Sequence, residues 1–296
     1  MRTKRRILLL GSRSAFTEIV LERLINAASG ELHLALEGPR RTAVPPQGAP
    51  AAPGELAVSA PHPLASRAAR FQVPVTEITR ASDILALGPA PDVIVSACFS
   101  LRLPQAVLDW PRHGCLNVHP SLLPAFRGPS PIFWQLHEGP GSTGVTVHRM
   151  VEAVDAGPVV AREDRPLEPG TSASALNRLL AKAGARLLAD ALRAKDWGKI
   201  ETTPQDESAA SYFSWPDDDA FRLQPDWPAT RAYGFMAGTR EWGRPYEMNL
   251  DGHHLVLERV LDYDPAGRLN SAFSTDGDTI TVAFSPGVVR AFGRVA

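Results

Sequence analysis

The sequence has little of what secreted, membrane and fibrous proteins require. Its 296 residues include two cysteines, Cys98 and Cys115, too few for a disulfide framework, so we expect a reduced, cytoplasmic setting. No run of about 18 consecutive apolar residues could span a membrane, and Ile7–Leu10 is too short an apolar run for a signal peptide. Hydrophobic residues make up 44% and charged residues 21%, which excludes a disordered chain and a coiled coil.

The sequence also has little net charge and lacks the common cofactor motifs. The formal charge of −1 argues against wholesale binding of nucleic acid. The turn at Gly11 lacks the further glycines of a dinucleotide-binding turn, and no P-loop lysine, CxxC or HExxH motif is present. His253 and His254 are adjacent and would face opposite sides of a strand, so the sequence predicts no metal site.

Strands and helices alternate along much of the chain. Ser14 is a suitable N-cap for a helix over Ala15–Ala28, and helical spacing of leucines predicts an amphipathic helix over Thr171–Arg193. Strands are expected at Arg6–Leu10, Leu32–Leu36, Val93–Ser96, Cys115–Val118 and Thr143–Met150. This alternation predicts an α/β fold with a doubly wound, mostly parallel sheet and helices on both faces.

A proline-rich segment, Gly38–Ala65, interrupts this pattern. Its prolines cannot easily join a helix or a central strand. We interpret the segment either as a mobile surface loop near a site or as an inert insertion.

The last third of the chain has a different pattern. Residues Asp196–Ser211 are polar and aperiodic, as in a linker. Tyr246–Leu250 and His254–Glu258, joined by Asp251–Gly252, predict a β-hairpin, and Thr279–Phe284 predicts a further strand. We therefore expect a larger domain over residues 1–205 and a smaller, β-rich domain over residues 211–296.

This smaller domain is acidic and contains several tryptophans. From residue 211 onward, eight arginines and no lysine stand against twelve acidic residues, including Asp217–Asp219, whereas the first 210 residues carry a net charge of +3. Trp215, Trp227 and Trp242 are more typical of the core of a β domain than of a pocket.

A polar constellation stands out between residues 114 and 131. Asn117 and His119 lie two residues apart on a predicted strand, so their side chains share a face. A proline-rich loop follows, at the strand end where ligands bind in parallel sheets. Two acids, Glu152 and Asp155, lie in the loop after the strand at 143–150.

Taken singly, these residues have ordinary explanations. Asn117 could hold a turn, His119 could be a satisfied core histidine, and Asp155 could cap a turn with Gly157. Cys115 is best explained by packing, because no partner that would activate its thiol is evident.

The joint pattern resembles the folate-dependent formyltransferases. The resemblance rests on Asn117–Gly128, Thr143–Met150 and Asp155–Gly157. That family includes methionyl-tRNA, glycinamide ribonucleotide and sugar-nucleotide amine formyltransferases. The resemblance covers about residues 1 to 200 and extends more weakly into 211–296. It implies a Rossmann-like catalytic domain, the active-site residues Asn117, His119 and Asp155, 10-formyltetrahydrofolate as formyl donor, and no metal.

The same resemblance implies a folate cleft in which backbone groups hold most of the pterin. The implied binding residues are Leu101, Arg102, Leu103, Ser121, Leu122, Leu123, Pro124, Val151, Glu152, Ala153, Val154 and Asp155. Core packing explains the Leu101 and Leu103 side chains equally well. Arg127 either fixes the loop or meets an anion, and Pro129 stands where some sugar-nucleotide relatives carry a basic residue.

Formyl transfer to an amine builds negative charge on oxygen and releases a proton from the amine. We expect the Asn117 amide and a charged His119 imidazole to face the developing charge. Asp155 is expected to favour the charged form of the imidazole.

The acidic C-terminal part decides our expectation for the acceptor, because phosphate contacts need a cationic surface. We expect a small-molecule amine, such as an amino sugar nucleotide or a primary or hydroxylated amine of an amino acid derivative, rather than tRNA. Methionyl-tRNA formyl transfer, a noncatalytic folate-binding relative and hydrolysis of the formyl folate stay as alternatives. Glycinamide ribonucleotide formyltransferases fit less well, because they generally lack the added C-terminal domain. No oligomeric state follows from the sequence.

Overall fold

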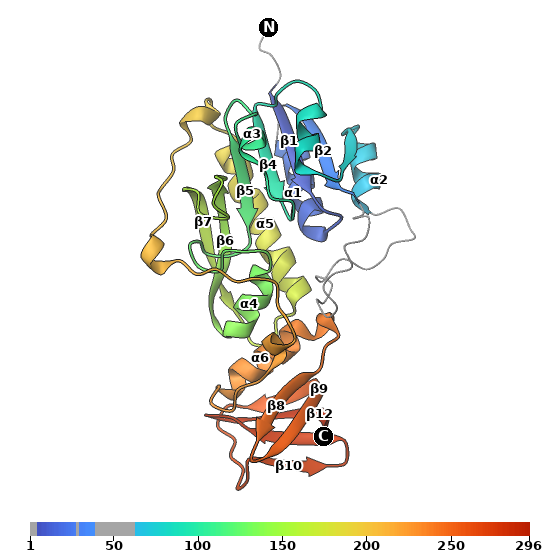
Figure 1. Ribbon diagram of the computed structural model, residues 1–296, viewed down its shortest axis with the longest axis vertical. Coiled ribbons are helices and arrows are strands. Elements are labelled where there is room, and N and C mark those ends of the chain that lie inside the picture. Colours follow the sequence, from blue (N-terminus) through green and yellow to red (C-terminus); the bar gives the residue numbers. More distant parts are fainter. Residues whose placement is uncertain (1–4, 28–29, 39–62) are drawn as a thin grey trace.

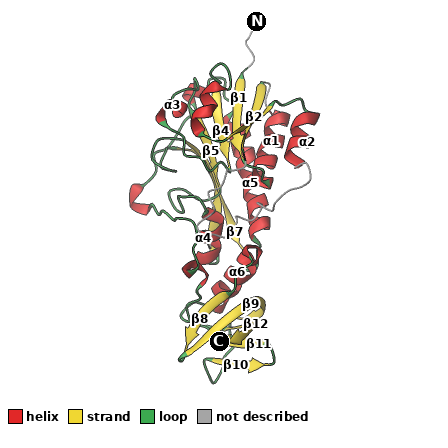
Figure 2. Cartoon of the chain, turned by 45° about the vertical axis from the view of Figure 1, so that its right-hand side comes forward, coloured by secondary structure: helices red, strands yellow, loops and turns green. Residues whose placement is uncertain are grey.

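The computed structural model describes residues 5–27, 30–38 and 63–296. It contains a seven-stranded sheet flanked by helices and a separate five-stranded sheet at the C-terminal end of the chain (Figures 1 and 2). No helix among the described residues is long and apolar enough to cross a membrane.

The larger sheet has the strand order β3-β2-β1-β4-β5-β6-β7. Its strands are β1 (Arg6–Gly11), β2 (Glu31–Glu37), β3 (Val75–Ile78), β4 (Val93–Ala97), β5 (Cys115–His119), β6 (Gly141–Arg149) and β7 (Val159–Leu167). The pairs from β3 to β5 are parallel, whereas β6 is antiparallel to both β5 and β7. The prediction of an α/β fold with a mostly parallel sheet is confirmed.

The helices lie on both faces of this sheet and between the two sheets. They are α1 (Ala15–Ala27), α2 (Pro63–Arg70), α3 (Gln105–Leu108), α4 (Pro131–Glu138), α5 (Ala173–Ala191) and α6 (Ala229–Thr239), with 3₁₀ turns η1 (Ala81–Ala86), η2 (Trp197–Lys199), η3 (Glu207–Ala209), η4 (Asp219–Phe221) and η5 (Arg240–Trp242). Leu9 and Val118 belong to the core formed with α1 and α5, whereas Leu10 and Cys115 belong to the core formed with η1 and α3. Because side chains alternate along β5, Asn117 and His119 lie on the Cys115 side.

The local signals for the first helix are confirmed, and the expected proline-rich loop needs a correction. The Ser14 hydroxyl accepts a hydrogen bond from the Thr17 N–H at 3.2 Å, as an N-cap does. Residues 39–62 of the expected loop lie outside the described residues. The prediction is wrong for residues 63–65, because α2 begins at Pro63, and a proline fits the first helical turn, where its missing N–H is not needed.

The C-terminal sheet is antiparallel, with the order β10-β11-β12-β9-β8. Its strands are β8 (Tyr246–Leu250), β9 (His253–Asp264), β10 (Phe273–Asp276), β11 (Thr279–Ala283) and β12 (Val288–Val295). The predicted hairpin is formed by β8 and β9. At its turn, Asp251 and Gly252 have φ angles of 49° and 79°, the left-handed values that a two-residue hairpin turn needs.

Helix α6 joins the two sheets and was not predicted from the sequence. Its glycines lower helical propensity, but one of them permits close packing. A Cβ at Gly238 would lie 2.7 Å from Leu136 Cδ2 of α4. Trp227 and Trp242 are each 8% exposed, as expected of core residues, whereas Trp215 is 49% exposed.

A second glycine brings α5 close to the strand that carries Asn117 and His119. A Cβ at Gly184 would lie 2.4 Å from Val118 Cγ1 and 2.7 Å from Val145 Cγ2. Val118 stands between Asn117 and His119 in the sequence. The contact with α5 therefore fixes how closely β5 approaches this helix beside Asn117 and His119.

We expect Gly184→Ala to lower the free energy of unfolding by about 1–3 kcal/mol, because the added methyl group overlaps Val118. This loss should exceed the gain of about 1 kcal/mol in helix propensity. Urea denaturation measures the change. Gly141→Ala is the control, because nothing lies within 4 Å of its new methyl group. Equal stability of Gly184→Ala and wild type would contradict the close approach.

Candidate active site

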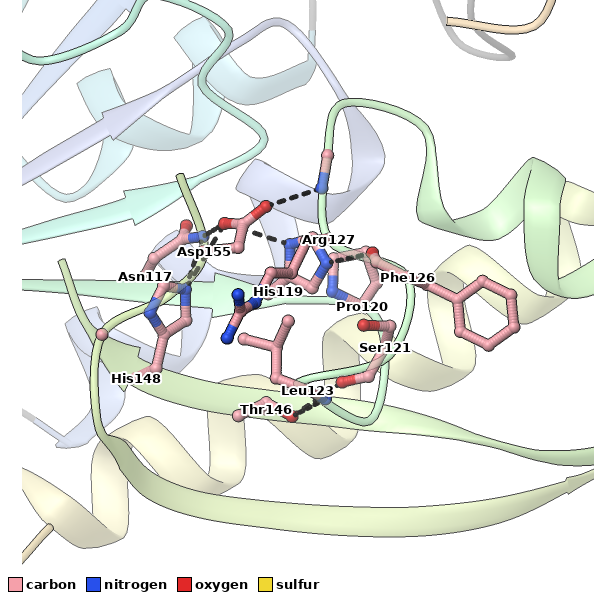
Figure 3. Close-up of polar contacts among 12 residues, drawn as sticks. Asn117, His119, Pro120, Ser121, Leu123, Phe126, Arg127, Thr146, His148 and Asp155 are labelled. Carbon is pink, nitrogen blue, oxygen red and sulfur yellow. Dashed lines mark hydrogen bonds and ion pairs between the residues drawn. The ribbon is translucent and has the colours of Figure 1, made fainter. Parts of the chain in front are cut away.

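Strands β5 and β6 place Asn117, His119 and His148 on one face of the sheet. Asn117 is paired with His148 in the antiparallel register, and its Nδ2 lies 3.2 Å from His148 Nε2 (Figure 3). His148 Nδ1 donates to the Arg149 carbonyl at 2.9 Å, so in the neutral ring Nε2 is the acceptor and the Asn117 amide is the donor. The orientation of the Asn117 amide is fixed by this bond.

The loop after β6 brings a carboxylate onto this face. Asp155 Oδ1 lies 3.6 Å from His119 Nδ1, 3.6 Å from His148 Nε2 and 3.5 Å from Asn117 Nδ2. Asp155 Oδ2 accepts a hydrogen bond from the Gly128 backbone N–H at 2.9 Å. The structure thus brings together the three residues predicted for the active site (Figure 3).

The turn that carries Asp155 is unusually tight. Asp155 has a φ of 54°, in the left-handed region that few residues with a side chain adopt. A Cβ at Gly157 would lie 1.8 Å from the Arg149 carbonyl oxygen. Glycine is therefore required at position 157 for the chain to return from β6 to β7 along this path.

His119 is buried, and burial and the neighbouring groups act on its pKa in opposite directions. Its Nε2 donates to the Phe126 carbonyl at 2.9 Å, which leaves Nδ1 facing Asp155. Burial lowers the pKa of His119 below 6.5, although Asp155 and the bond to Phe126 act in the opposite direction. Burial thus favours the neutral ring in the protein alone, whereas the charged imidazole is expected during the reaction and stays a prediction.

Asp155 responds to the same surroundings in the opposite way. Burial by itself would raise the pKa of this carboxyl, but His119, His148 and the Gly128 N–H together hold it well below the ordinary value of 3.8. Asp155 is therefore ionised at neutral pH.

The loop after β5 is held in place by Thr146 of β6. The Thr146 hydroxyl donates to the Ser121 carbonyl at 2.7 Å and accepts from the Leu123 N–H at 3.1 Å. The Ser121 and Leu123 side chains are fully buried, whereas Leu122 and Pro124 are half-buried. Of these four residues predicted to bind folate, Ser121 and Leu123 use their side chains to shape the loop.

A pocket of about 400 Å³ lies at the start of β5, and none of Asn117, His119, His148 and Asp155 is among its lining residues. Its lining comes from α3, the start of β5 and the loop after β6, namely Gln105, Leu108, Asp109, Gly114, Cys115, Arg149, Met150, Val151 and Glu152. Val151 and Val154 are 44% and 41% exposed. Two of the predicted folate-binding residues, Val151 and Glu152, thus line the pocket, and Val154 lies in the same loop.

The segment Leu101–Leu103 lies next to that loop. The Arg102 guanidinium donates to the Glu152 carbonyl at 3.2 Å. Leu103 is buried in the core and Leu101 is half-buried, whereas Arg102 and Ala153 are exposed. The two segments predicted to hold the pterin are therefore neighbours in space.

Cys115 forms part of the pocket wall. Burial, helped by the nearby Asp109 charge, raises the pKa of its thiol to about 12. The thiol stays protonated and unreactive at neutral pH, which agrees with the packing role expected for it.

Arg127 fixes the loop rather than meeting an external anion. It is 8% exposed, and its guanidinium donates to Glu207 at 2.7 and 2.9 Å and to Gln205 Oε1 at 2.8 Å. Neither His148 nor Gln205 was expected at the site. The available signal for His148 was its place on the strand predicted over Thr143–Met150, directly before the loop that carries Asp155. Gln205 lies in the predicted linker and gave no such signal.

Among the described residues, no three or more His, Cys, Asp or Glu side chains form a group that could hold a metal ion.

Comparison with known proteins decides the family. A family model described as formyl transferase matches residues 49–192. A methionyl-tRNA formyltransferase of Pelobacter propionicus is 32% identical over 225 residues, covering 71% of this chain and 70% of that protein. The chain belongs to the formyltransferase family. A methionyl-tRNA formyltransferase of Halalkalibacterium halodurans is 33% identical over 201 residues, covering 66% of this chain and 63% of that protein. The chain thus spans somewhat less than two thirds of this second relative.

Two solved structures share the fold of almost the whole chain. An N-formyltransferase from Helicobacter canadensis, in complex with folinic acid and dTDP-3-aminofucose, has a TM-score of 0.67 at 14% identity, covering 97% of this chain and 99% of that one. HypX from Aquifex aeolicus, in complex with tetrahydrofolic acid, has a TM-score of 0.56 at 16% identity, covering 97% of this chain and 43% of that one.

We expect the His119 imidazole to titrate below pH 6.5, and Asp155→Asn to lower its pKa further, because the carboxylate is the main group that favours the charged ring. An NMR titration of the imidazole protons measures both values, and the spectrum of His119→Gln identifies the signal. A wild-type pKa at or above 6.5, or a rise in Asp155→Asn, would contradict a site dominated by burial.

Proposed function

We propose that this protein is an N-formyltransferase that moves a formyl group from 10-formyltetrahydrofolate to an amine of a small molecule. The observation that carries this proposal is the convergence of Asn117, His119 and His148 on Asp155 Oδ1, with the contacts at 3.5–3.6 Å. The pocket of about 400 Å³ at the start of β5 and the exposed Val151 suit a flat, partly apolar ring. Two proteins with the same fold bind folinic acid and tetrahydrofolic acid.

In this proposal, 10-formyltetrahydrofolate supplies the formyl carbon, and each side chain has one task. Asn117 Nδ2 lies 3.5 Å from Asp155 Oδ1, which is long for a hydrogen bond. The formyl oxygen would take the place of this weak contact. The amide then stabilises the negative charge that develops on that oxygen, an effect of about 2–4 kcal/mol for one such donor.

His119 handles the proton. Its unprotonated Nδ1 accepts the proton that the amine loses as the new carbon–nitrogen bond forms. Asp155, ionised and 3.6 Å away, stabilises the resulting imidazolium. The proton then goes to the folate nitrogen whose bond to the formyl carbon breaks, so His119 returns to its neutral form.

A small acceptor is supported by charge. Residues 211–296 carry a net charge of −4 and include no lysine, a poor surface for phosphate contacts. The Helicobacter canadensis enzyme, which was solved with an amino sugar nucleotide, aligns over nearly the whole chain. Methionyl-tRNA is the second candidate, because the relatives at 32% and 33% identity are methionyl-tRNA formyltransferases.

The direct test is a screen of candidate amines with 10-formyltetrahydrofolate, read by product mass. A product heavier by one formyl group than a small amine supports the proposal. Formylation of methionyl-tRNA alone supports the second candidate, and no product with any acceptor would refute formyl transfer.

We expect His119→Ala to fold normally and to lower kcat at least about 100-fold, because the substitution removes the group that accepts the proton. His254→Ala is the matched control, since that ring lies on the C-terminal sheet beside Glu247. Steady-state kinetics and circular dichroism measure the two effects. Activity of His119→Ala within a few-fold of wild type would remove His119 from the mechanism.

We expect weak binding to bulk tRNA. The slope of log affinity against log salt concentration should be shallower than about −2, because few cationic side chains can replace counterions. Filter binding at two salt concentrations measures the slope. A slope of about −4 or steeper would indicate several phosphate contacts and would favour methionyl-tRNA as the acceptor.

A further inference from the structure

The segment between the two sheets is bound to the candidate active site along its length. We call residues 203–213 the strap. Thr203 exchanges two backbone hydrogen bonds with Val159 of β7, each 2.8 Å long. Further along, the Arg127 N–H donates to the Ser211 carbonyl and the Phe213 N–H to the Arg127 carbonyl, both at 2.9 Å. The strap therefore connects β7 with the loop after β5 and is not a free linker (Figure 1).

Gln205 lies at the centre of the strap, and its amide has a partner at every position. Gln205 Nε2 donates to the carbonyls of Asp155 and Gly157 at 2.7 and 2.6 Å. Its Oε1 accepts from Nε and Nη2 of Arg127 at 3.3 and 2.8 Å. A guanidinium only donates and a carbonyl only accepts, so one orientation of the amide satisfies all four contacts.

These contacts hold the backbone that presents the Asp155 carboxylate. Asp155 is in the left-handed region with a φ of 54°, a conformation that surrounding contacts must maintain. Gln205 holds the carbonyl at this residue and the carbonyl two residues later. Arg127, at the other side of the amide, precedes Gly128, whose N–H donates to Asp155 Oδ2 at 2.9 Å. The Gln205 amide thus connects the turn that contains the Asp155 backbone carbonyl with the loop whose Gly128 N–H holds the Asp155 carboxylate.

We propose that Gln205 is a positioning residue for the reaction, which sets the place of the Asp155 carboxylate against His119 by tying its turn to Arg127. This proposal rests on the proposed function, because it assigns Gln205 a role in formyl transfer. A misplacement of about 1 Å at a reacting group can cost about 100-fold in rate. The loss should therefore appear in kcat.

Two substitutions separate positioning from general stability. Gln205→Glu keeps an oxygen for Arg127 but places a second oxygen against the two carbonyls, so it loses only the contacts with the turn. Gln205→Met has a similar length, carries no charge and loses all four contacts. Gln224→Glu and Gln224→Met are matched controls, because Gln224 is exposed and its side chain forms no hydrogen bond with any residue that the structure describes.

The experiment measures kcat, KM for the amine and the unfolding temperature of all five proteins. We expect both Gln205 variants to lose about 10- to 100-fold in kcat, with KM for the amine changed by less than about threefold. Gln205→Glu should unfold within a few degrees of wild type, and both Gln224 variants should match wild type. A kcat of Gln205→Glu within threefold of wild type would overturn the positioning role, as would a loss of kcat no larger than the loss of folded protein.

A second readout separates this proposal from the proposed function. If the wild-type chain forms no formylated product, the proposed function fails. The titration of the His119 imidazole then tests separately whether Gln205 places the Asp155 carboxylate. The charged and titratable groups that face His119 are Asp155 and His148. In Gln205→Met we expect the His119 pKa to fall, because the released turn carries Asp155 away from the ring. An unchanged pKa would overturn the placement of the carboxylate by Gln205.

Discussion

The buried carboxylate of Asp155 is the interaction on which the rest of the site depends. A buried anion is unfavourable unless charges and hydrogen bonds compensate it. Here the Asn117 amide and the Gly128 N–H donate to it, and ring nitrogens of His119 and His148 lie 3.6 Å from it. Burial acts against charge on both groups, and it lowers the His119 pKa, whereas the groups around Asp155 keep its carboxyl ionised. An imidazole nitrogen that faces an ionised carboxylate is the result.

The change of strand direction in the larger sheet creates this arrangement. Because β6 is antiparallel to β5, it ends beside the start of β5, where the Met150 N–H donates to the Cys115 carbonyl at 2.8 Å. The following loop must return to begin β7, and on its way it crosses the face that carries Asn117 and His119. The tight turn at Asp155–Gly157 occurs at this crossing.

The sequence predicted those parts of the structure that depend on neighbouring residues. Alternation along β5 placed Asn117 and His119 on one face, and Asp251–Gly252 marked a hairpin turn, because both effects are local. The charge of the His119 ring in the protein alone could not be predicted in this way, because it depends on how deeply the ring is buried. That quantity is set by distant elements.

The contacts that were not predicted also depend on residues far apart in the sequence. Gln205 lies 78 residues from Arg127 in sequence, and nothing in the polar segment around it indicates which side chain it will meet. Helix α6 was missed for a related reason, since its glycines look unfavourable until the contact of Gly238 with Leu136 is known. Local propensity is a weak guide wherever tertiary packing decides the outcome.

The strap also affects how such chains could be recombined. A junction placed between residues 205 and 211, where composition alone suggests a boundary, would separate Arg127 from Glu207 and remove the backbone pairing at Ser211 and Phe213. The nearly buried guanidinium would then lack its anionic partner. A chimaera that takes its C-terminal sheet from another family member would therefore keep the loop after β5 intact only if the crossover fell after Phe213. The strap therefore belongs structurally with the larger sheet and would have to be exchanged together with it.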